Sequence, residues 1–432
     1  MPSPHRTILN AALPLFLSMS AGIIAQLLGT ALLGHQGTAQ LAAFALVCAV
    51  LNPVTAAVSG GLRGMSPFVA ACRDRPAEAL PILKDARWLS LGIGVVGAGV
   101  MLAVPLIARL SGVPYDLGAL PQIFALQVLL AAAGGGANGV LIALGHSRLV
   151  LRSGLTSTAA EVILLLVLVP PTGAHGAALA LLASTALALT LSNALLLRRP
   201  EFAGQSLLPR RPRPHPILRM ARLGIPMSAS VVLKFAVMGG ATYAAARTGP
   251  HAAAAHAILA ALDGLLGLAA FAVAQAVTPE IARSHAPADA RRANRAALAI
   301  ASAGTLAAGL ALLLLGAEAL GPFTSDPRVL AAALPLLPLL LVYALANNCG
   351  IVLSAGLMGL RRSSWSLGSA VLGYGLLAVA MTPVTAAWGL TGLWTALTAA
   401  RALILAVQAA GFTRHSARLP ISPRSGAQEE PG

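Results

Sequence analysis

The chain has 432 residues, of which 57% are apolar, 10% are charged and 4% are aromatic, and its formal net charge is +16 at pH 7. A soluble protein covers its surface with about 25% charged residues, so this composition excludes a soluble enzyme and indicates a chain that lies mainly in a membrane. Cys48, Cys72 and Cys349 have no partners at suitable spacing, which excludes a disulfide framework and a zinc site.

Apolar runs of about 20 residues, the length that crosses a bilayer as a helix, recur along the whole chain. They predict an all-α integral membrane fold with twelve transmembrane helices. The predicted spans are residues 8–33, 40–62, 88–109, 118–143, 153–170, 175–197, 222–246, 252–279, 296–320, 329–355, 366–384 and 389–412.

The basic residues are concentrated in alternate connections between these spans. Of 29 Lys and Arg residues, 24 lie in the N-terminus, every second loop and the C-terminal tail, and two lie within spans. The opposite loops hold only Arg109, Arg247 and Arg328. The positive-inside rule therefore predicts that both termini and the basic loops are cytoplasmic. The membrane topology therefore accounts for the net positive charge, and no nucleic-acid partner is expected.

An internal repeat relates the two halves of the chain. A shift of 212 residues aligns Pro14 with Pro226 and Gly37 with Gly249, and a shift of 216 aligns Gly173 with Gly389. The first span, although Arg6 precedes it as in a signal peptide, is therefore the counterpart of the seventh and belongs to the fold. Because the period is six helices, the repeats run parallel about the membrane normal.

The repeat and the connections between its halves predict the domain organisation. We expect an N-lobe at 1–197 with helices 1–6 and a C-lobe at 220–413 with helices 7–12. A Pro/Arg-rich cytoplasmic linker at 198–219 joins the lobes, and a cytoplasmic, disordered tail covers 414–432. Two lobes that face each other across a central site are the layout of secondary transporters.

Several segments resemble one transporter family. ALPLFLSMSAGIIAQLLGTALLGHQGTAQLAAFAL (12–46) is similar to the opening helix pair of multidrug and toxic compound extrusion (MATE) transporters, and residues 223–258 resemble the opening of the family's second repeat. Further similar segments follow in order at 276–301, 323–330 and 352–364. The resemblance implies export of amphipathic, often cationic or aromatic compounds, driven by inward flow of protons or sodium, without a cofactor or a metal.

Three positions depart from what the resemblance implies. The family usually carries an Asp in helix 1, a Glu in helix 7 and an Asp in helix 10, where this chain has Gly29, Lys234 and Asn347. Sodium requires several oxygen ligands, preferably with carboxylate charge. The departures therefore argue against a sodium site of the family type and favour the proton as the coupling ion.

Glu161 is the first of two acids that remain at membrane depth. It lies about eight residues into the fifth span, or ~12 Å deep at a rise of about 1.5 Å per residue. A charged side chain at the bilayer centre costs about 2.5–3.5 kcal/mol on insertion scales, so its presence suggests that Glu161 carries the coupling proton. The structural alternative is a neutral Glu161 that hydrogen-bonds a neighbouring helix through Thr156 or Thr158.

Lys234 and Asp263 flank the short turn at Gly249 at nearly equal separations, so neighbouring antiparallel helices would hold them at similar depth. They form either a structural latch between helices 7 and 8 or a functional pair in which Lys234 attracts anions or takes part in coupling. Arg401 in helix 12 either bonds backbone carbonyls or lines the pathway. Lys234, Asp263, Asn347 and Arg401 are thus the candidate cavity or charge-pair residues.

Other features have structural explanations. Gly92, Gly94 and Gly97 spell GxGxxG, but they lie within a predicted helix, where close packing explains them better than dinucleotide binding. We interpret His256 as a packing or hydrogen-bonding residue. Proline frees a backbone carbonyl and permits bending, so Pro14 and Pro226, which recur in the repeat, are hinge candidates.

The sequence as a whole predicts a secondary active efflux transporter of the inner (plasma) membrane that exports amphipathic small molecules by cation antiport, most simply with protons. The alternative is a flippase or an exporter of anionic or lipid-linked metabolites, which the basic residues at membrane depth would suit. An enzyme is excluded because no catalytic constellation and no extramembrane domain are present. The expected partners are a drug or metabolite and the lipid bilayer, and the expected state is a monomer.

Overall fold

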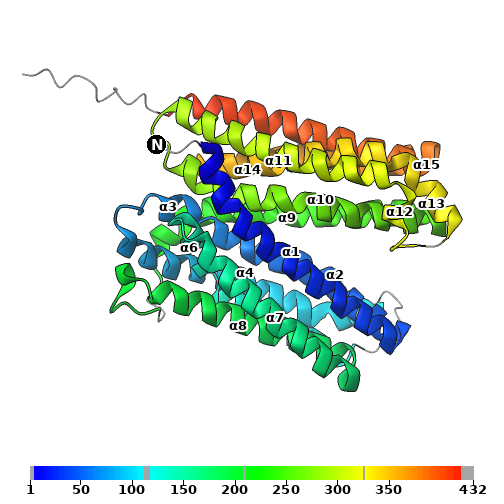
Figure 1. Cartoon of the computed structure of the whole chain (residues 1–432), viewed down its shortest axis with the longest axis horizontal. Helices are drawn as coiled ribbons and strands as arrows, with labels where there is room; N and C mark the ends of the chain where they lie inside the picture. The colour runs from blue at the N-terminus through cyan, green and yellow to red at the C-terminus, as the bar shows by residue number, and fades with distance from the viewer. Residues whose placement is uncertain (1–3, 111–116, 208–210, 325, 420–432) are drawn as a thin grey trace, which may run out of the picture.

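The structure, a computed structural model, describes residues 4–110, 117–207, 211–324 and 326–419, which form two helical bundles (Figure 1). The first bundle, the N-lobe, contains α1 (Pro4–Gln36), α2 (Thr38–Arg63), α3 (Ser66–Ala70), α4 (Ala79–Leu110), α5 (Leu120–Gly134), α6 (Ala137–Ala143), α7 (Ser147–Thr172) and α8 (Ala174–Leu197). The second bundle, the C-lobe, contains α9 (Pro214–Arg247), α10 (Pro250–Ala282), α11 (Pro287–Leu315), α12 (Ala317–Leu320), α13 (Pro327–Ala333), α14 (Leu337–Gly359) and α15 (Ser363–Ser416). Short 3₁₀ turns lie at Pro76–Glu78, Pro200–Phe202 and Leu334–Leu336.

The number of spans agrees with the sequence prediction. Ten helices in the described ranges are long and apolar enough to cross a membrane, and α5 with α6 forms one further span with a 41° bend. Gly389 is non-helical and divides the 54-residue α15 into two arms, 363–388 and 390–416. The described part of the chain therefore forms twelve spans, six in each lobe, which confirms the predicted fold class.

Some helix boundaries differ from the prediction, and each difference has a local cause. α4 begins at Ala79 rather than at residue 88, because its first turns are charged and lie outside an apolar window. α9 begins at Pro214, inside the predicted linker, since proline is well suited to the first turn of a helix. Residues 208–210 of that linker and residues 420–432 of the predicted tail lie outside the described ranges.

The backbone confirms the internal repeat at its turns. Gly37 has φ 127° and ψ 151°, and Gly249 has φ 129° and ψ 164°, so the two lobes make the same turn between their first and second spans. Gly173 and Gly389 likewise share φ near 57°, with values of 56° and 58°. Positive φ strains any residue with a Cβ atom, which explains why glycine recurs at all four positions.

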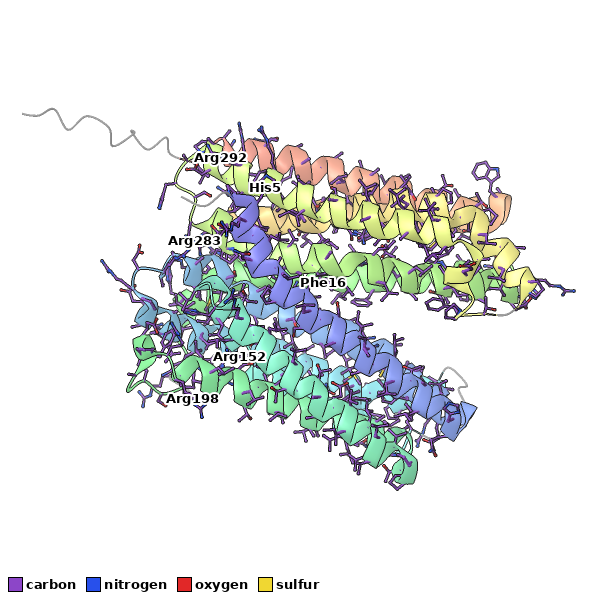
Figure 2. All side chains as sticks on the ribbon, in the orientation of Figure 1. His5, Phe16, Arg152, Arg198, Arg283 and Arg292 are labelled. Atoms are coloured by element: carbon purple, nitrogen blue, oxygen red, sulfur yellow. The ribbon has the colours of Figure 1, made fainter. Side chains whose placement is uncertain are left out.

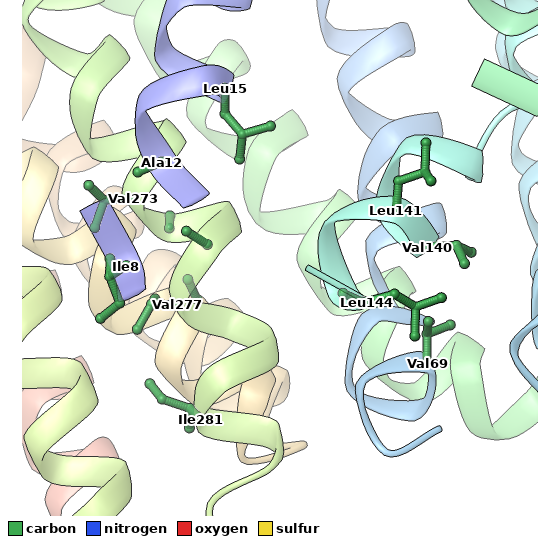
Figure 3. Close-up of a cluster of buried hydrophobic side chains, with 14 of the residues drawn as sticks. Ile8, Ala12, Leu15, Val69, Val140, Leu141, Leu144, Val273, Val277 and Ile281 are labelled. Carbon is green, nitrogen blue, oxygen red and sulfur yellow. The ribbon is translucent and has the colours of Figure 1, made fainter. Parts of the chain in front are cut away.

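The lobes are joined at one end of the molecule. Figure 2 shows His5, Arg198, Arg283 and Arg292 at this end, which we call the basic end. The hydrophobic core at the basic end contains residues of both lobes, and Figure 3 shows Ile8 of α1 beside Val277 of α10. Toward the opposite end each lobe has a core of its own, and the two bundles diverge in Figure 1.

Helices α2 and α9 cross with their backbones almost in contact. A Cβ atom added at Gly224 of α9 would lie 2.7 Å from the carbonyl oxygen of Gly61, and one added at Gly64 would lie 2.8 Å from the backbone nitrogen of Gly224. The Ser228 hydroxyl donates to the carbonyl oxygen of Ala57 at 2.6 Å. Only small residues permit such an approach between helices, so this crossing fixes the position of one lobe against the other.

Polar contacts between the lobes also close the basic end. Arg213, just before α9, forms an ion pair with Asp85 of α4, whose side chain is only 2% exposed. Arg283 at the end of α10 donates to the carbonyl oxygen of Ala143 in α6 at 3.0 Å. In the C-lobe, Arg219 and Arg361 place their guanidinium groups over the ring of Phe68 in α3. These contacts would have to break for the lobes to separate at this end.

Candidate functional site

The N-lobe has a small polar cluster around Glu161. Glu161 lies on α7, half-buried, and its Oε2 atom accepts a hydrogen bond from the Ser184 hydroxyl of α8 at 3.3 Å. No Lys, Arg or His of the described residues forms an ion pair with it within 4.0 Å. The cluster therefore holds an acid that is partnered by a neutral group.

The interhelical partner of Glu161 differs from the two that the sequence suggested. Thr156 does not reach across to another helix, because its hydroxyl donates to the carbonyl oxygen of Arg152 one turn earlier, at 2.9 Å. The partner is Ser184, which is buried and also lies 3.1 Å from the carbonyl oxygen of Leu181. Since one hydroxyl proton serves two acceptors, the bond to Glu161 can be exchanged without leaving Ser184 unsatisfied.

A second pair of polar residues extends this cluster toward α5. Gln127 of α5 donates through Nε2 to the Thr185 hydroxyl at 3.0 Å, while its Oε1 atom is buried without a hydrogen-bond partner. Thr185 is the neighbour of Ser184 on α8. An unpaired buried oxygen is costly unless a donor reaches it, so Gln127 Oε1 is an acceptor that stays unsatisfied in this conformation.

Gly29 of α1 lies close to the same region. A Cβ atom at Gly29 would meet the buried side chain of Leu165 at 3.4 Å. Leu165 is one helical turn after Glu161 on α7, and residues four apart in a helix share a face. Glu161 therefore lies one helical turn from the residue that contacts Gly29, the position at which the family resemblance would place an acid on α1.

The C-lobe contains a larger polar cluster in its interior. The Asp263 carboxylate of α10 accepts hydrogen bonds from Nδ2 of Asn347 on α14 at 3.2 and 3.4 Å, and both residues are buried. Lys234 of α9 lies within electrostatic range of Asp263 and of Arg401, but no ion pair within 4.0 Å joins Lys234 to Asp263. The direct latch that the sequence suggested is not formed in this conformation, because Asn347 occupies the carboxylate.

Arg401 lies at the centre of this cluster, on the second arm of α15. Its guanidinium carbon is 5.1 Å from the ring centre of Tyr374 and 6.0 Å from that of Tyr343, which are cation–π distances. All three residues are at most 8% exposed. The Nε and Nη2 atoms of Arg401 and the Tyr374 hydroxyl have no hydrogen-bond partner. Arg401 is therefore held by aromatic rings while two of its donors stay free for another group.

The charges of the C-lobe cluster do not balance. Two basic side chains, Lys234 and Arg401, lie within electrostatic range of the single acid Asp263. With both bases charged, the interior of this lobe is net positive by one unit. The structure thus brings together the four residues that the sequence analysis proposed for the cavity or charge pair. They are Lys234, Asp263, Asn347 and Arg401.

His256 lies beside this cluster as a packing residue. It is fully buried in α10, and its ring centre is 5.7 Å from that of Trp394. Neither ring nitrogen of His256 has a hydrogen-bond partner, and the Trp394 indole nitrogen also lacks one. Tyr343 packs edge-on against the same indole at 5.4 Å. The ring contact supports the packing interpretation of His256.

An apolar pocket lies between the lobes. It has a volume of about 410 Å³ and is lined by Ile93 of α4 together with α9 residues that are all apolar except Ser228. Leu233, one of these residues, is next to Lys234 in the sequence. Pockets of roughly 300–1,000 Å³ with mostly apolar walls suit small organic ligands, so this space is a candidate binding site for the apolar part of a substrate.

The two hinge candidates lie in continuous helices. α1 continues through the buried Pro14, and α9 continues through Pro226. The carbonyl oxygen of Pro226 accepts a hydrogen bond from the Ser230 hydroxyl at 2.7 Å. Neither helix is broken in this conformation, so a hinge role for Pro14 and Pro226 stays a prediction.

Several residues of the two clusters were missed by the sequence analysis. Tyr343 could have been found, because it lies one helical turn before Asn347 and so on the same face. Two of the four tyrosines of the chain are in the C-lobe cluster, so the scarcity of this residue was a usable signal. Ser184 and Gln127 had no such signal, since small and polar residues occur in most of the helices.

Comparison with known proteins gives consistent results over most of the chain. Residues 226–384 match the MatE family model. The chain is 29% identical over 426 residues to the "Probable multidrug resistance protein NorM" of Xanthomonas campestris pv. campestris, covering 91% of this chain and 90% of that protein.

Solved structures share the fold. One is described as the outward-facing conformation of a multidrug resistance MATE family transporter; it is 19% identical, with a TM-score of 0.82, and the match covers 97% of this chain and 96% of that one. A transporter of the MOP superfamily from Pyrococcus furiosus, described as having a binding pocket of reverse polarity, is 18% identical with a TM-score of 0.80 and the same coverage. Fold, family model and relatives agree, and the chain is similar to MATE family efflux transporters over most of its length.

Proposed function

We propose that this protein exports amphipathic small molecules across the bacterial inner membrane by proton antiport. The NorM relatives support the substrate class, and the apolar pocket between the lobes offers about 410 Å³ for such a molecule. Both polar clusters are built by one chain, so the proposed transporter acts as a monomer.

In this proposal the basic end is cytoplasmic. The concentration of Arg and Lys at that end supports this orientation through the positive-inside rule. The lobes share a core at the basic end and diverge toward the other, so the conformation is outward-open. An impermeant thiol reagent tests the orientation on a chain that lacks Cys48, Cys72 and Cys349. A cysteine at residue 206 should stay unlabelled in intact cells and become labelled in inverted vesicles, whereas labelling in intact cells would contradict the proposal.

Glu161 is the proton carrier in the proposed mechanism, and the observation that carries this assignment is its environment. It is an acid at membrane depth that accepts from the Ser184 hydroxyl and forms no ion pair among the described residues. A cation partner favours the charged form of an acid and so opposes its protonation. An acid without one can be neutral when water is excluded and charged when water enters, which is what a carrier must do.

Coupling requires that proton and substrate bind the two conformations of the transporter differently. The outward-open state gives Glu161 access to protons from outside, and closure of the lobes excludes water from it. The same closure changes the walls of the interlobe pocket, because Ile93 belongs to the N-lobe and the rest of the wall to the C-lobe. One movement of the lobes therefore affects both binding sites.

Transport by purified protein in proteoliposomes tests the role of Glu161. Under an imposed pH gradient, Glu161→Gln should lose gradient-driven efflux almost completely, because the amide cannot exchange a proton. Glu318→Gln is the matched control, since Glu318 is an exposed acid on α12, and it should transport like the unchanged protein. Full transport by Glu161→Gln, or transport that needs only a sodium gradient, would contradict the proposal.

A second candidate function is export or flipping of anionic molecules. The observation that favours it is the net positive C-lobe cluster, in which Arg401 has two donor atoms without partners. A panel of cationic, neutral and anionic compounds in an efflux-deficient host separates the two candidates. If anions are the substrates, Lys234→Gln should remove resistance to anionic compounds alone; equal resistance to all anions with and without Lys234 would count against this candidate.

A further inference from the structure

A basic pocket opens at the surface where α1 and α11 begin. It has a volume of about 590 Å³ and is lined by His5 of α1 and by Arg291, Arg292, Arg295 and three alanines of α11. Figure 2 shows His5 next to Arg292 at the basic end of the molecule. The pocket shares no residue with either polar cluster, and it has no role in the proposed transport mechanism.

The arginines of the pocket differ in their partners. Arg291 is tied to the end of α15, where its Nε donates to the Ser416 hydroxyl at 3.1 Å and its Nη2 to the carbonyl oxygen of Thr413 at 3.3 Å. Arg292 and Arg295 are exposed, and within the described ranges no carboxylate lies within 4.0 Å of either one. The pocket thus presents two unpaired guanidinium groups beside a third that is fixed.

Such a set of donors matches one chemical group. Guanidinium groups form paired hydrogen bonds with the oxygens of a phosphate, and basic pockets between membrane helices on the cytoplasmic side can hold lipid head groups. The alanines leave room for a head group between the arginines. The pocket therefore suits an anionic phosphodiester.

The surface below the pocket is apolar and continues into the membrane. On α1 the exposed Leu9 and Leu13 follow His5 at intervals of four residues, which keeps them on the face of His5. On α11 the exposed Leu306 and Leu310 follow Arg295 along the helix toward the membrane interior. A ligand with a phosphodiester head and two acyl chains fits this arrangement, whereas a free phosphate would use only its upper part.

We propose that this pocket binds the head group of an anionic phospholipid of the cytoplasmic leaflet. His5 belongs to the N-lobe and the three arginines belong to the C-lobe, so the site is complete only while the lobes meet at the basic end. A bound lipid therefore stabilises the outward-open state. This inference rests on the proposed orientation but not on the role of Glu161.

Native mass spectrometry of the full-length protein in detergent measures lipid binding directly, with phosphatidylglycerol and phosphatidylcholine as probes. The unchanged protein should retain phosphatidylglycerol preferentially. Arg292→Gln with Arg295→Gln should weaken that binding about thirtyfold, since each of the two basic residues near an anionic lipid surface contributes about one kcal/mol. Ala299→Leu keeps every charge but narrows the pocket, and it should also weaken binding.

The matched control is Arg148→Gln with Arg152→Gln. These two exposed arginines lie at the basic end of α7, but they do not line the pocket. The control protein should bind phosphatidylglycerol like the unchanged one. Equal loss in the control and in the Arg292/Arg295 variant would overturn the proposal, as would undiminished binding by the Ala299→Leu and double-arginine proteins. Displacement of the lipid by millimolar inorganic phosphate would overturn it too.

Spin labels test the effect on conformation. Cysteines replacing Gln36 at the end of α1 and Arg247 at the end of α9 report the separation of the lobes opposite the basic end. Phosphatidylglycerol should increase the population with the longer distance, and this increase should vanish in the Arg292/Arg295 variant. An unchanged distance distribution in the presence of bound lipid would refute the link between the lipid and the outward-open state.

Discussion

In the N-lobe, Glu161 on α7 accepts a hydrogen bond from Ser184, whereas the equivalent position of the C-lobe, 216 residues later, is the buried Leu377. On the following span the ionisable residue is in the C-lobe instead, because the neutral Thr185 of the N-lobe corresponds to Arg401 of the C-lobe. The repeat thus keeps the same turns and helices, but at these two pairs of corresponding positions the N-lobe carries an acid and the C-lobe carries a base. In the proposed mechanism, the two halves of a duplicated scaffold would in this way divide proton binding and ligand binding between them.

The largest effect is expected from removing the acid of the C-lobe. Asp263→Asn leaves Lys234 and Arg401 without a negative charge in a buried cluster, and an unbalanced buried charge costs about 3 kcal/mol. The variant should unfold at a clearly lower temperature in detergent, as measured by intrinsic fluorescence. Adding Lys234→Gln should restore part of the loss. No recovery in the double variant would show that Lys234 does not sense Asp263.

A smaller effect is expected in the N-lobe, where the partner of the acid is neutral. Ser184→Ala removes a single hydrogen bond to Glu161, which contributes about 1 kcal/mol, and should slow proton-driven efflux about fivefold without preventing folding. Thr156→Ala is the control, because that hydroxyl bonds its own helix. Equal rates in the two variants would mean that Ser184 does not position Glu161.

The smallest effect is expected from Tyr374→Phe. The Tyr374 hydroxyl is buried without a partner, so its removal should change the free energy of unfolding by less than about 0.5 kcal/mol, or raise it slightly. The ring that packs on Arg401 is retained. Thermal unfolding in the absence of substrate measures this effect, and a large loss of stability would reveal a bound water or ion that the hydroxyl holds.

The sequence predicted the fold well because its signals are local. Apolar run length and the glycine pairs 37/249 and 173/389 determine where helices span and turn, and both signals can be counted along the chain. The 41° bend between α5 and α6 falls at the run Gly134-Gly135-Gly136. Three consecutive glycines would also have allowed this bend to be predicted. The prediction failed mainly where charged turns extend a helix beyond the membrane, as at Ala79.

The composition of the site was harder to predict, because it depends on how each helix is rotated about its axis. In a soluble protein an apolar stripe shows which face of a helix is buried. Here lipid and protein both favour apolar side chains, so most helices are apolar all round and Ser184 could not be assigned to Glu161. Lys234 and Asp263 were expected at similar depth and lie within electrostatic range of each other, but depth did not reveal that Asn347 would bond the carboxylate.

The glycine crossing of α2 and α9 has a mechanical consequence. Gly61 and Gly224 meet there without intervening side chains, so the crossing can act as the fulcrum of a lever whose long arm is the rest of α9. From Gly224 to Arg247 that arm is about 35 Å long, and a rigid rotation of roughly 10° at the fulcrum would displace its far end by about 6 Å. A bulky residue at either glycine would push α2 and α9 apart at the crossing. It would thereby restrict the rotation of α9 and reduce the displacement of its far end.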